Sequence, residues 1–250
     1  MSAPVIYSGN DHTPAFESAY DFVWPTMYPG KLIKRYQRFK ADIILENGRI
    51  ITAHCPNSGR MEGCSEPERL VYVSKSNNPR RKYLYTWEMI QMPTSLVIVN
   101  TLLANCLIKE AILGGKVPLL TKYDKLSSEV PYGQNSRIDI LLENSEERCL
   151  VEIKSCTLAR DRTAFFPDAP TSRGRKHLIE LKKSLNEKTR CVMFYLVQRM
   201  DTDSFSPACF IDPEYCREFM DAVSKGVEVI VYDVSIDRYG VSLNKELDFF

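Results

Sequence analysis

The amino-acid sequence predicts an α+β or α/β fold, in which a small β-barrel is followed by a mixed β-sheet flanked by helices. Residues up to 95 read as short β-rich runs separated by turn signals, whereas helical periodicity begins only after residue 100. The hydrophobic content of 44% and the charged content of 26% are typical of a globular chain with a core. We therefore expect two domains, residues 1–97 and 98–250, with residues 1–20 as an N-terminal extension.

The expected barrel consists of short strands that end at turn signals. The β-rich runs are residues 38–45, 48–55, 69–76 and 82–91. Turn signals lie at Asn47-Gly48, Ser58-Gly59 and Asn77-Asn78-Pro79. Several short strands with this punctuation, in a domain of this size, fit an OB-like barrel.

The second half mixes helices and strands. Asn100 is expected to cap a helix that ends at Gly114-Gly115 and buries Leu103, Cys106, Leu107 and Ala111. A hairpin over 136–155 follows, and then Thr171 or Ser172 caps a helix with Leu178, Leu181 and Leu185 on its inner face. Residues 190–198 and 227–236 read as buried strands. Between them, Asp212 and Pro213 are typical of a helix start.

The hairpin carries charges where buried strands usually carry apolar residues. With a loop at 144–147, Leu142 faces Cys149, and the same register sets Asp139 opposite Glu152. Strict alternation then places Asp139, Glu152 and Lys154 on one face of the hairpin. The other face takes the apolar residues Ile138, Ile140, Leu142, Val151 and Ile153.

Two directly opposed carboxylates destabilise a sheet unless a cation lies between them. Asp139 and Glu152 are therefore candidate ligands of Mg²⁺ (or Mn²⁺), with Glu129 as a third carboxylate from the preceding segment. Lys154 could orient a water molecule or stabilise charge on a phosphate, so these four residues form a candidate catalytic set for phosphodiester hydrolysis. The alternative is an exposed sheet face with an ordinary surface pattern, on which Glu129 is also only a surface acid.

Nucleic-acid binding is suggested by local charge, because the net charge is only +1. Residues 31–40 hold five basic residues and no acid, and residues 154–190 hold ten basic and four acidic residues. The candidate contacts are Lys34, Arg35, Arg38, Arg81, Lys82, Arg173, Arg175, Lys176 and His177. Solvated surfaces and a structural histidine are the alternatives. Tyr83, Tyr85 and Trp87 could likewise stack on bases or fill the barrel core, and the core interpretation is favoured.

A series of motifs, taken in order, resembles a known family. The series is RFKADI, HCPNSGRM, NPRRKYLYTWEMI, VNTLLAN, EVPYG, SRID, VEIKSCTL, FPDAPTSRGRKHLIEL and FIDPEY. RIDILLE followed by CLVEIKS resembles the D…(D/E)xK core of the PD-(D/E)xK nuclease superfamily. The full series, from residue 20 onward, resembles the sugar fermentation stimulation protein A family.

This resemblance implies an OB-like domain, a nuclease-like domain, DNA binding of low sequence specificity and a regulatory role in maltose metabolism. It implies that Glu129, Asp139, Glu152 and Lys154 occupy the acidic and lysine positions of the site. The sequence departs from the pattern in two places. Ile138 replaces the proline of the superfamily motif, and Glu68 follows Pro67 where the resemblance implies a glycine.

We therefore expect a DNA-binding protein, for single- or double-stranded DNA, with a Mg²⁺-dependent nuclease-like site, and thus a possible endonuclease or phosphodiesterase. A DNA-binding regulatory protein that does not cut is the main alternative. A small-molecule phosphodiesterase is a further one, although it leaves the basic helix start unused. The eight cysteines show no metal-site spacing, and no secretory signal or membrane-length apolar stretch occurs, so we expect reduced thiols and a cytoplasmic location.

Overall fold

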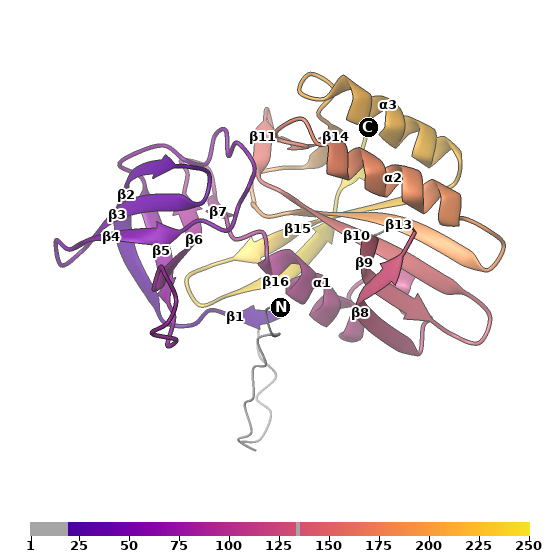
Figure 1. Cartoon of the computed structure of the whole chain (residues 1–250), viewed down its shortest axis with the longest axis horizontal. Helices are drawn as coiled ribbons and strands as arrows, with labels where there is room; N and C mark the ends of the chain where they lie inside the picture. The colour runs from indigo at the N-terminus through magenta and orange to yellow at the C-terminus, as the bar shows by residue number, and fades with distance from the viewer. Residues whose placement is uncertain (1–19, 134–135) are drawn as a thin grey trace, which may run out of the picture.

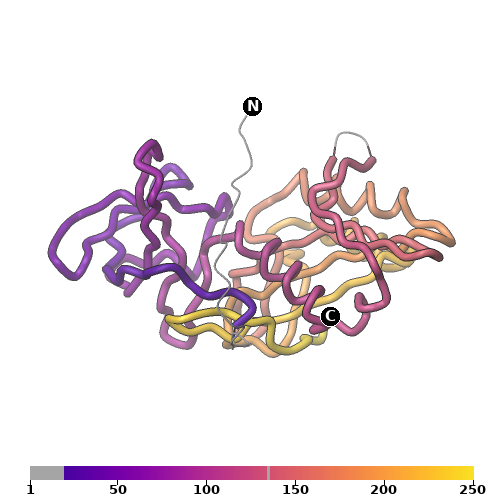
Figure 2. The backbone as a smooth tube through the Cα atoms, turned by 90° about the horizontal axis from the view of Figure 1, so that it is seen from below, coloured from indigo at the N-terminus to yellow at the C-terminus, as the bar shows by residue number. Residues whose placement is uncertain are grey.

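The computed structural model describes residues 20–133 and 136–250. A closed β-barrel, formed by the N-terminal part of this chain, lies beside a mixed sheet that carries helices on both faces (Figures 1 and 2). This arrangement confirms the fold class predicted from the sequence.

The barrel is built from β2 to β6, and β7 lies outside it. The strands are β2 (Met27–Tyr36), β3 (Lys40–Leu45), β4 (Ile50–His54), β5 (Leu70–Lys75), β6 (Tyr85–Gln91) and β7 (Leu96–Ile98). Their order is β4-β3-β2-β5-β6-β7, and a parallel pairing of β4 with β6 closes five of them into a barrel. The four predicted runs are all strands. The long strand β2 was missed, because Pro29 and Gly30 interrupt its β-rich pattern.

Aromatic side chains of β6 lie in the core of the barrel and not on its outer surface. Tyr85 and Trp87 are buried in the core formed by the barrel strands, which confirms the core interpretation for both. Tyr83 precedes β6 and is only half-buried; the ammonium groups of Lys40 and Lys82 lie 5.9 and 5.7 Å from its ring centroid. The barrel is thus held by apolar burial, and only Tyr83 of the three is on the outside.

The second sheet has seven strands in the order β1-β16-β15-β13-β10-β9-β8. They are β1 (Phe22–Val23), β16 (Gly240–Glu246), β15 (Glu228–Ile236), β13 (Thr189–Val197), β10 (Arg148–Cys156), β9 (Ser136–Glu143) and β8 (Lys125–Tyr132). Strands β10, β13 and β15 are parallel, and the other pairs are antiparallel. A small sheet of β11 (Leu158–Arg160), β12 (Thr163–Phe166), β14 (Ser204–Pro207) and β17 (Asp248–Phe249) packs through Ala164 and Phe205 against the large sheet.

Helices cover both faces of the large sheet, so that its central strands are apolar on both sides. Helix α1 (Leu103–Leu113) packs against one face, and α2 (Ser172–Ser184) and α3 (Pro213–Ser224) pack against the other (Figure 1). A short 3₁₀ helix, η1 (Pro118–Leu120), follows α1. None of the helices in the described part of the chain has the length and apolar character needed to span a bilayer.

The helix starts were predicted with mixed success. The Thr171 hydroxyl accepts a hydrogen bond from the Gly174 N–H, and Asp212 accepts one from the Tyr215 N–H, so both N-caps are confirmed. Helix α1 instead begins after Leu102, and the Asn100 side chain accepts from the Leu102 N–H one residue before the helix. Cys106, which we expected in the core, is exposed.

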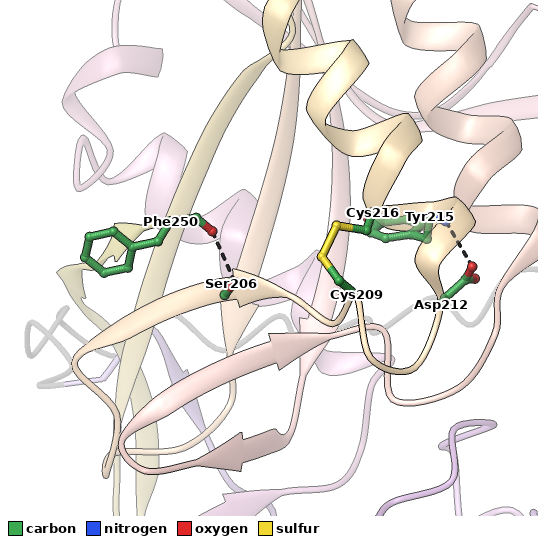
Figure 3. Close-up of a disulfide and its surroundings, with 6 residues drawn as sticks. All are labelled: Ser206, Cys209, Asp212, Tyr215, Cys216 and Phe250. Atoms are coloured by element: carbon green, nitrogen blue, oxygen red, sulfur yellow. Dashed lines mark hydrogen bonds between the residues drawn. A yellow bond between two sulfur atoms is a disulfide. The ribbon is translucent and has the colours of Figure 1, made fainter.

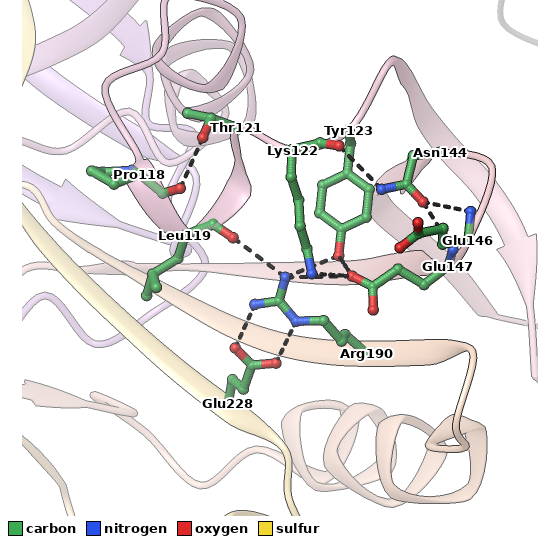
Figure 4. A network of polar contacts seen from close by, with 10 residues as sticks. All are labelled: Pro118, Leu119, Thr121, Lys122, Tyr123, Asn144, Glu146, Glu147, Arg190 and Glu228. Carbon is green, nitrogen blue, oxygen red and sulfur yellow. Dashed lines mark hydrogen bonds and ion pairs between the residues drawn. The ribbon is translucent and has the colours of Figure 1, made fainter.

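A polar network ties together the amino-terminal ends of the parallel strands (Figure 4). The Arg190 guanidinium on β13 donates two hydrogen bonds, of 2.8 and 2.6 Å, to the Glu228 carboxylate on β15. It also donates to the Tyr123 hydroxyl, which in turn donates to Glu147 in the hairpin turn. Bidentate charge-assisted bonds of this kind fix geometry well. The network therefore anchors the end of the sheet that is remote from the carboxyl end of β10.

Two cysteines form a disulfide, which corrects the expectation that all eight are thiols. Cys209 and Cys216 join the loop before α3 to the first turn of that helix (Figure 3). Within the same turn, the Asp212 carboxylate accepts from the N–H of Thr171 at 2.8 Å. The beginning of α3 is thus fixed to the beginning of α2, and the two cysteines are seven positions apart in the chain.

Glu68, which stands where the family resemblance implies a glycine, has an unfavourable backbone conformation. Glu68 has φ +65°, a left-handed conformation that glycine adopts freely and other residues adopt at a cost. The turn cannot relax easily, because the Glu68 N–H donates to the Leu32 carbonyl at 2.7 Å.

We expect Glu68→Gly to raise the free energy of unfolding by about 0.5–1 kcal/mol, because glycine removes this penalty. Urea unfolding of the purified protein measures the change. Glu68→Ala is the control: it removes the same charge but keeps a Cβ, so it should give no gain. A gain of equal size with alanine would contradict the explanation by backbone conformation.

Candidate active site

Strand β10 carries the predicted site at the centre of the large sheet, between β9 and β13. Leu142 pairs with Cys149, as the register predicted, and the ladder between β9 and β10 ends at the pair Ile140 and Val151. Continuing that register would set Asp139 opposite Glu152, but the two residues form no backbone pair. The hairpin therefore opens where the charged residues begin.

The alternation of side chains breaks at the same place. Ile140 packs in the core under α1, whereas Ile138 packs with Leu150 in the core under α2 and α3. The prediction that Ile138 and Ile140 share a face is thus wrong. The neighbouring ladder to β8 also lacks the pair of Glu129 with Asp139, and Glu129 has φ +55°. A local irregularity of this kind, like a β-bulge, re-aims a side chain.

Asp139 has no backbone partner on β10 or β8, and its side chain makes hydrogen bonds instead. One carboxylate oxygen accepts from the Ile153 N–H at 2.7 Å, and the other accepts from the Asn105 amide on α1 at 2.8 Å. Burial of the half-buried carboxyl, together with the nearby charge of Glu152, raises the pKa of Asp139 above its ordinary value. When Asp139 is ionised, its carboxylate therefore lies close to the second carboxylate of Glu152, and this proximity disfavours the charged form.

Glu152 is almost fully buried, with 2% of its surface exposed. Its Oε1 accepts from the Lys154 ammonium at 2.6 Å and contacts Nδ1 of His177. Burial alone would raise the pKa of Glu152, but the His177 hydrogen bond and the Lys154 charge outweigh it and lower the pKa. The carboxylate is therefore kept ionised. Its second oxygen, Oε2, is buried without a hydrogen-bond partner among the described residues.

His177 lies in the interior and not at the surface where we expected it to contact nucleic acid. Only 4% of its surface is exposed, and its Nε2 accepts a hydrogen bond of 3.4 Å from Arg173 one turn earlier on α2. An accepting Nε2 places the proton on Nδ1, which then donates to Glu152. His177 therefore holds the carboxylate from α2, while Lys154 holds it from β10.

Glu129 is not brought into this cluster. Its side chain is exposed, and its carbonyl accepts from Arg137. In residues 20–133 and 136–250, no three His, Cys, Asp or Glu side chains are placed to hold a metal ion. Asp139 and Glu152 remain, and two carboxylates are enough for Mg²⁺, which keeps several waters. The buried, unpartnered oxygen of Glu152 fits such an ion, because an unmatched buried anion is costly.

The predicted basic contacts have different environments. The Arg35 guanidinium donates to the carbonyls of Arg38, Asn57, Gly59 and Arg60, so it fixes loops instead of standing free. Other candidates have local partners. These pairs are Lys34 with Asp42 and the Tyr36 ring, Arg81 with Thr86, Lys82 with the Tyr83 ring, Arg175 with Glu214 and Lys176 with Glu180. Arg38 and Arg173 are exposed, and both line a cavity next to Lys154.

This cavity has a volume of about 400 Å³ and lies at the carboxyl end of β10. Its walls come from the barrel loop at 57–59, from the start of α1 and from the segment 165–171 before α2. The two domains meet at its rim, where Asp168 accepts from the Met61 N–H at 3.0 Å. The barrel loop that contains Gly59 thus lies against the other domain.

Two residues of the site were missed. Asn105 is a polar residue in the first turn of α1, and Asp168 lies in the loop between β12 and α2. A polar residue within an amphipathic helix is weak as a signal, because an exposed position explains it equally well. Asp168 gave no signal, since its partner is a backbone N–H more than a hundred residues away in the chain.

The closed barrel and the mixed sheet with helices on both faces define a two-domain protein in which an OB-like domain precedes an α/β domain. The model for the "SfsA N-terminal OB domain" matches residues 33–99, and the model for the "Sugar fermentation stimulation protein RE domain" matches residues 102–240. The chain belongs to the sugar fermentation stimulation protein family.

Curated relatives and a solved structure agree with this assignment. The chain is 47% identical over 223 residues to the sugar fermentation stimulation protein homolog of Pelobacter propionicus, covering 89% of this chain and 97% of that one. It is 48% identical over 215 residues to the homolog of a Shewanella species, covering 85% and 92%. The structure of Pyrococcus furiosus SfsA in complex with Ca²⁺ superposes with a TM-score of 0.85 at 24% identity, over 92% of this chain and 99% of that chain.

The opposite pKa shifts of the two acids lead to opposite expectations for their amides in metal-free protein. The raised pKa of Asp139 means that its charge opposes folding once the pH exceeds that pKa; Asp139→Asn should therefore leave stability at pH 7 unchanged or higher. The lowered pKa of Glu152 gives stability above the ordinary glutamate pKa, which is lost as the pH falls through the folded value. Glu152→Gln should therefore cost about 1–3 kcal/mol at pH 7.

Urea unfolding in the presence of EDTA measures both changes. The Asn105 amide can rotate so that its oxygen accepts from the new amide at position 139. The Asp139→Asn substitution therefore keeps the hydrogen bond between these two side chains. Equal losses of stability in the two variants would contradict the electrostatic description of the site.

Proposed function

We propose that this protein hydrolyses phosphodiester bonds in DNA with a divalent metal, Mg²⁺ or Mn²⁺, held by Asp139 and Glu152. The observation that carries the proposal is the buried Oε2 of Glu152, which has no hydrogen-bond partner in the described part of the chain, although Lys154 and His177 both contact the other oxygen. A purely structural ion pair has no need of an unmatched buried oxygen beside a second carboxylate.

Each residue of the site has a role in this chemistry. The metal, when bound, polarises a phosphoryl oxygen and lowers the pKa of a water molecule. The Lys154 ammonium donates one hydrogen bond to Glu152. Its side chain also lines the cavity, where the remaining N–H groups can stabilise charge on the phosphate. His177 keeps Glu152 ionised and oriented, and Asn105 does the same for Asp139. The Ca²⁺ reported for the Pyrococcus furiosus protein is also a divalent ion with a preference for oxygen ligands.

The DNA backbone would approach along the basic start of α2. Arg173 is exposed there, and Arg38 of the barrel faces the same cavity from the other domain. Contacts of this kind neutralise phosphates without reading base sequence, as expected for low sequence specificity. A cytoplasmic location agrees with such a substrate.

A DNA-binding regulatory protein that does not cut is the second candidate. It is favoured by the exposed position of Glu129, which leaves the site with two carboxylates in the described part of the chain. The name of the family refers to sugar fermentation, and a regulatory role would agree with it. The two candidates differ in one testable property, namely cleavage that depends on a metal.

Circular single-stranded and supercoiled DNA, incubated with the protein and Mg²⁺ or Mn²⁺, tests the proposal. We expect nicking that EDTA abolishes and that Lys154→Ala reduces at least about 100-fold, because the substitution removes a cation from the developing charge. Lys125→Ala is the matched control, since this exposed lysine pairs with Glu143 away from the site. Binding without any cleavage by the unmodified protein would support the regulatory candidate.

Arg173→Gln should weaken DNA binding. It should also make the slope of log K against log salt concentration less steep, by the amount that corresponds to one phosphate contact. Fluorescence anisotropy with labelled DNA at several salt concentrations measures both quantities. Lys183→Gln, on an exposed position of the same helix, makes the same change of charge and should leave the slope unchanged. Equal effects of the two substitutions would mean that α2 contributes only general charge.

A further inference from the structure

We propose that the cavity beside Lys154 receives a single unpaired nucleotide, so that the preferred substrate is DNA with an unpaired nucleotide next to the bond that is cut. The inference rests on the proposed function and adds the kind of DNA to it. The inference rests on three features of the cavity. The second domain lines it with aromatic and proline residues, the barrel lines it with a polar loop, and three cationic side chains surround it. Residues that line the cavity include Arg38, Asn57, Ser58, Lys154, Phe165 and Arg173.

The size of the cavity suits one nucleotide. Its volume of about 400 Å³ is in the range of sites for small ligands, about 300–1,000 Å³. The barrel loop and the segment 165–171 enclose it from two sides, and Asp168 ties them together at the rim. A base that is still paired brings its partner strand with it, and a cavity of this volume has no room for both. Enzymes that act inside a duplex meet this limit by extruding the nucleotide.

The chemistry of the walls suits a base and a phosphate. Phe165 and Pro170, which are not buried, line one side of the cavity with apolar groups, on which a base can stack. Ser58 lies on the barrel side, where its hydroxyl can meet the edge of a base, and the buried Asn57 orders this loop by accepting from the Gly59 N–H at 2.8 Å. Lys154, Arg38 and Arg173 place positive charge where the phosphates of the same nucleotide would lie.

The barrel side of the cavity is held in place by a single arginine. Arg35 donates to the carbonyls of Asn57 and Gly59 at 2.8 Å each, and to the carbonyl of Arg38 at 3.1 Å. It thereby joins the loop that carries Ser58 to the turn that carries Arg38. On the opposite side, the Asp212 carboxylate fixes Thr171 at the end of the aromatic segment. A pocket with both walls fixed in advance loses little entropy when it binds.

The test uses two duplexes that contain the fluorescent base 2-aminopurine, in one paired with thymine and in the other unpaired as a single-nucleotide bulge. In EDTA, where cleavage is prevented, we expect the full-length protein to bind the bulged duplex about tenfold more tightly, the gain expected from one stacked base. The fluorescence of the unpaired probe should change on binding. In Mg²⁺, the cut should lie at a phosphate that adjoins the unpaired nucleotide.

Ser58→Trp fills the cavity from an exposed position of the barrel loop and should abolish the preference for the bulge. The matched control is Ser145→Trp, in the exposed turn at the far end of the β9–β10 hairpin, which should keep it. If Ser58→Trp unfolds at a lower temperature than the unmodified protein, Ala169→Leu narrows the same cavity from the opposite wall and serves as the second variant.

The outcomes separate this proposal from the one on which it rests. A preference for the bulge that Ser58→Trp removes, without cleavage in any metal, supports the pocket and contradicts the hydrolase. Cleavage with equal affinity for both duplexes, unchanged by Ser58→Trp, overturns the pocket and leaves the hydrolase in place. Failure to bind either duplex overturns both.

Discussion

The burial of the Glu152 carboxylate in a central strand is the constraint on which the rest of the second domain depends. An ionised carboxylate with 2% exposure is far too costly to leave unpaired. Lys154 from its own strand and His177 from α2 meet one of its oxygens, and this sets how α2 must lie across the sheet. The other oxygen has no hydrogen-bond partner within residues 20–133 and 136–250, and the proposed metal site rests on this observation.

The start of α2 follows from the same constraint. A basic first turn is unfavourable for a helix, because the macrodipole prefers acids at that end. Here Arg173 donates to His177 and so supports the residue that holds Glu152, while Thr171 caps the helix. Asp212 and the disulfide of Cys209 with Cys216 then join this turn to α3. The unfavourable charges are thus held by interactions that also organise the site.

Patterns that are local in the chain could be predicted from the sequence, and contacts between distant segments could not. Turn signals and β-branched runs gave four barrel strands, and loop length gave the pairing of Leu142 with Cys149. Alternation failed at Ile138 because it assumes a regular ladder, and here Asp139 takes over a backbone partner. His177 read as a surface cation because nothing near it in the sequence shows that Glu152 would lie against its ring. The closure of the barrel through β4 and β6, and the disulfide, are contacts of the same kind.

The contact between the two domains explains why a barrel accompanies this sheet. The cavity exists only because the barrel loop stands opposite the segment that leads into α2, and Arg35 and Asp168 hold the two in register. Arg35 was a reasonable candidate for a phosphate contact by its charge, but four backbone carbonyls occupy its guanidinium. A residue of the barrel thus shapes a space that opens on Lys154 in the other domain. The barrel is therefore one wall of the candidate site, and its loop at 57–59 shapes the cavity together with β10 and the start of α2.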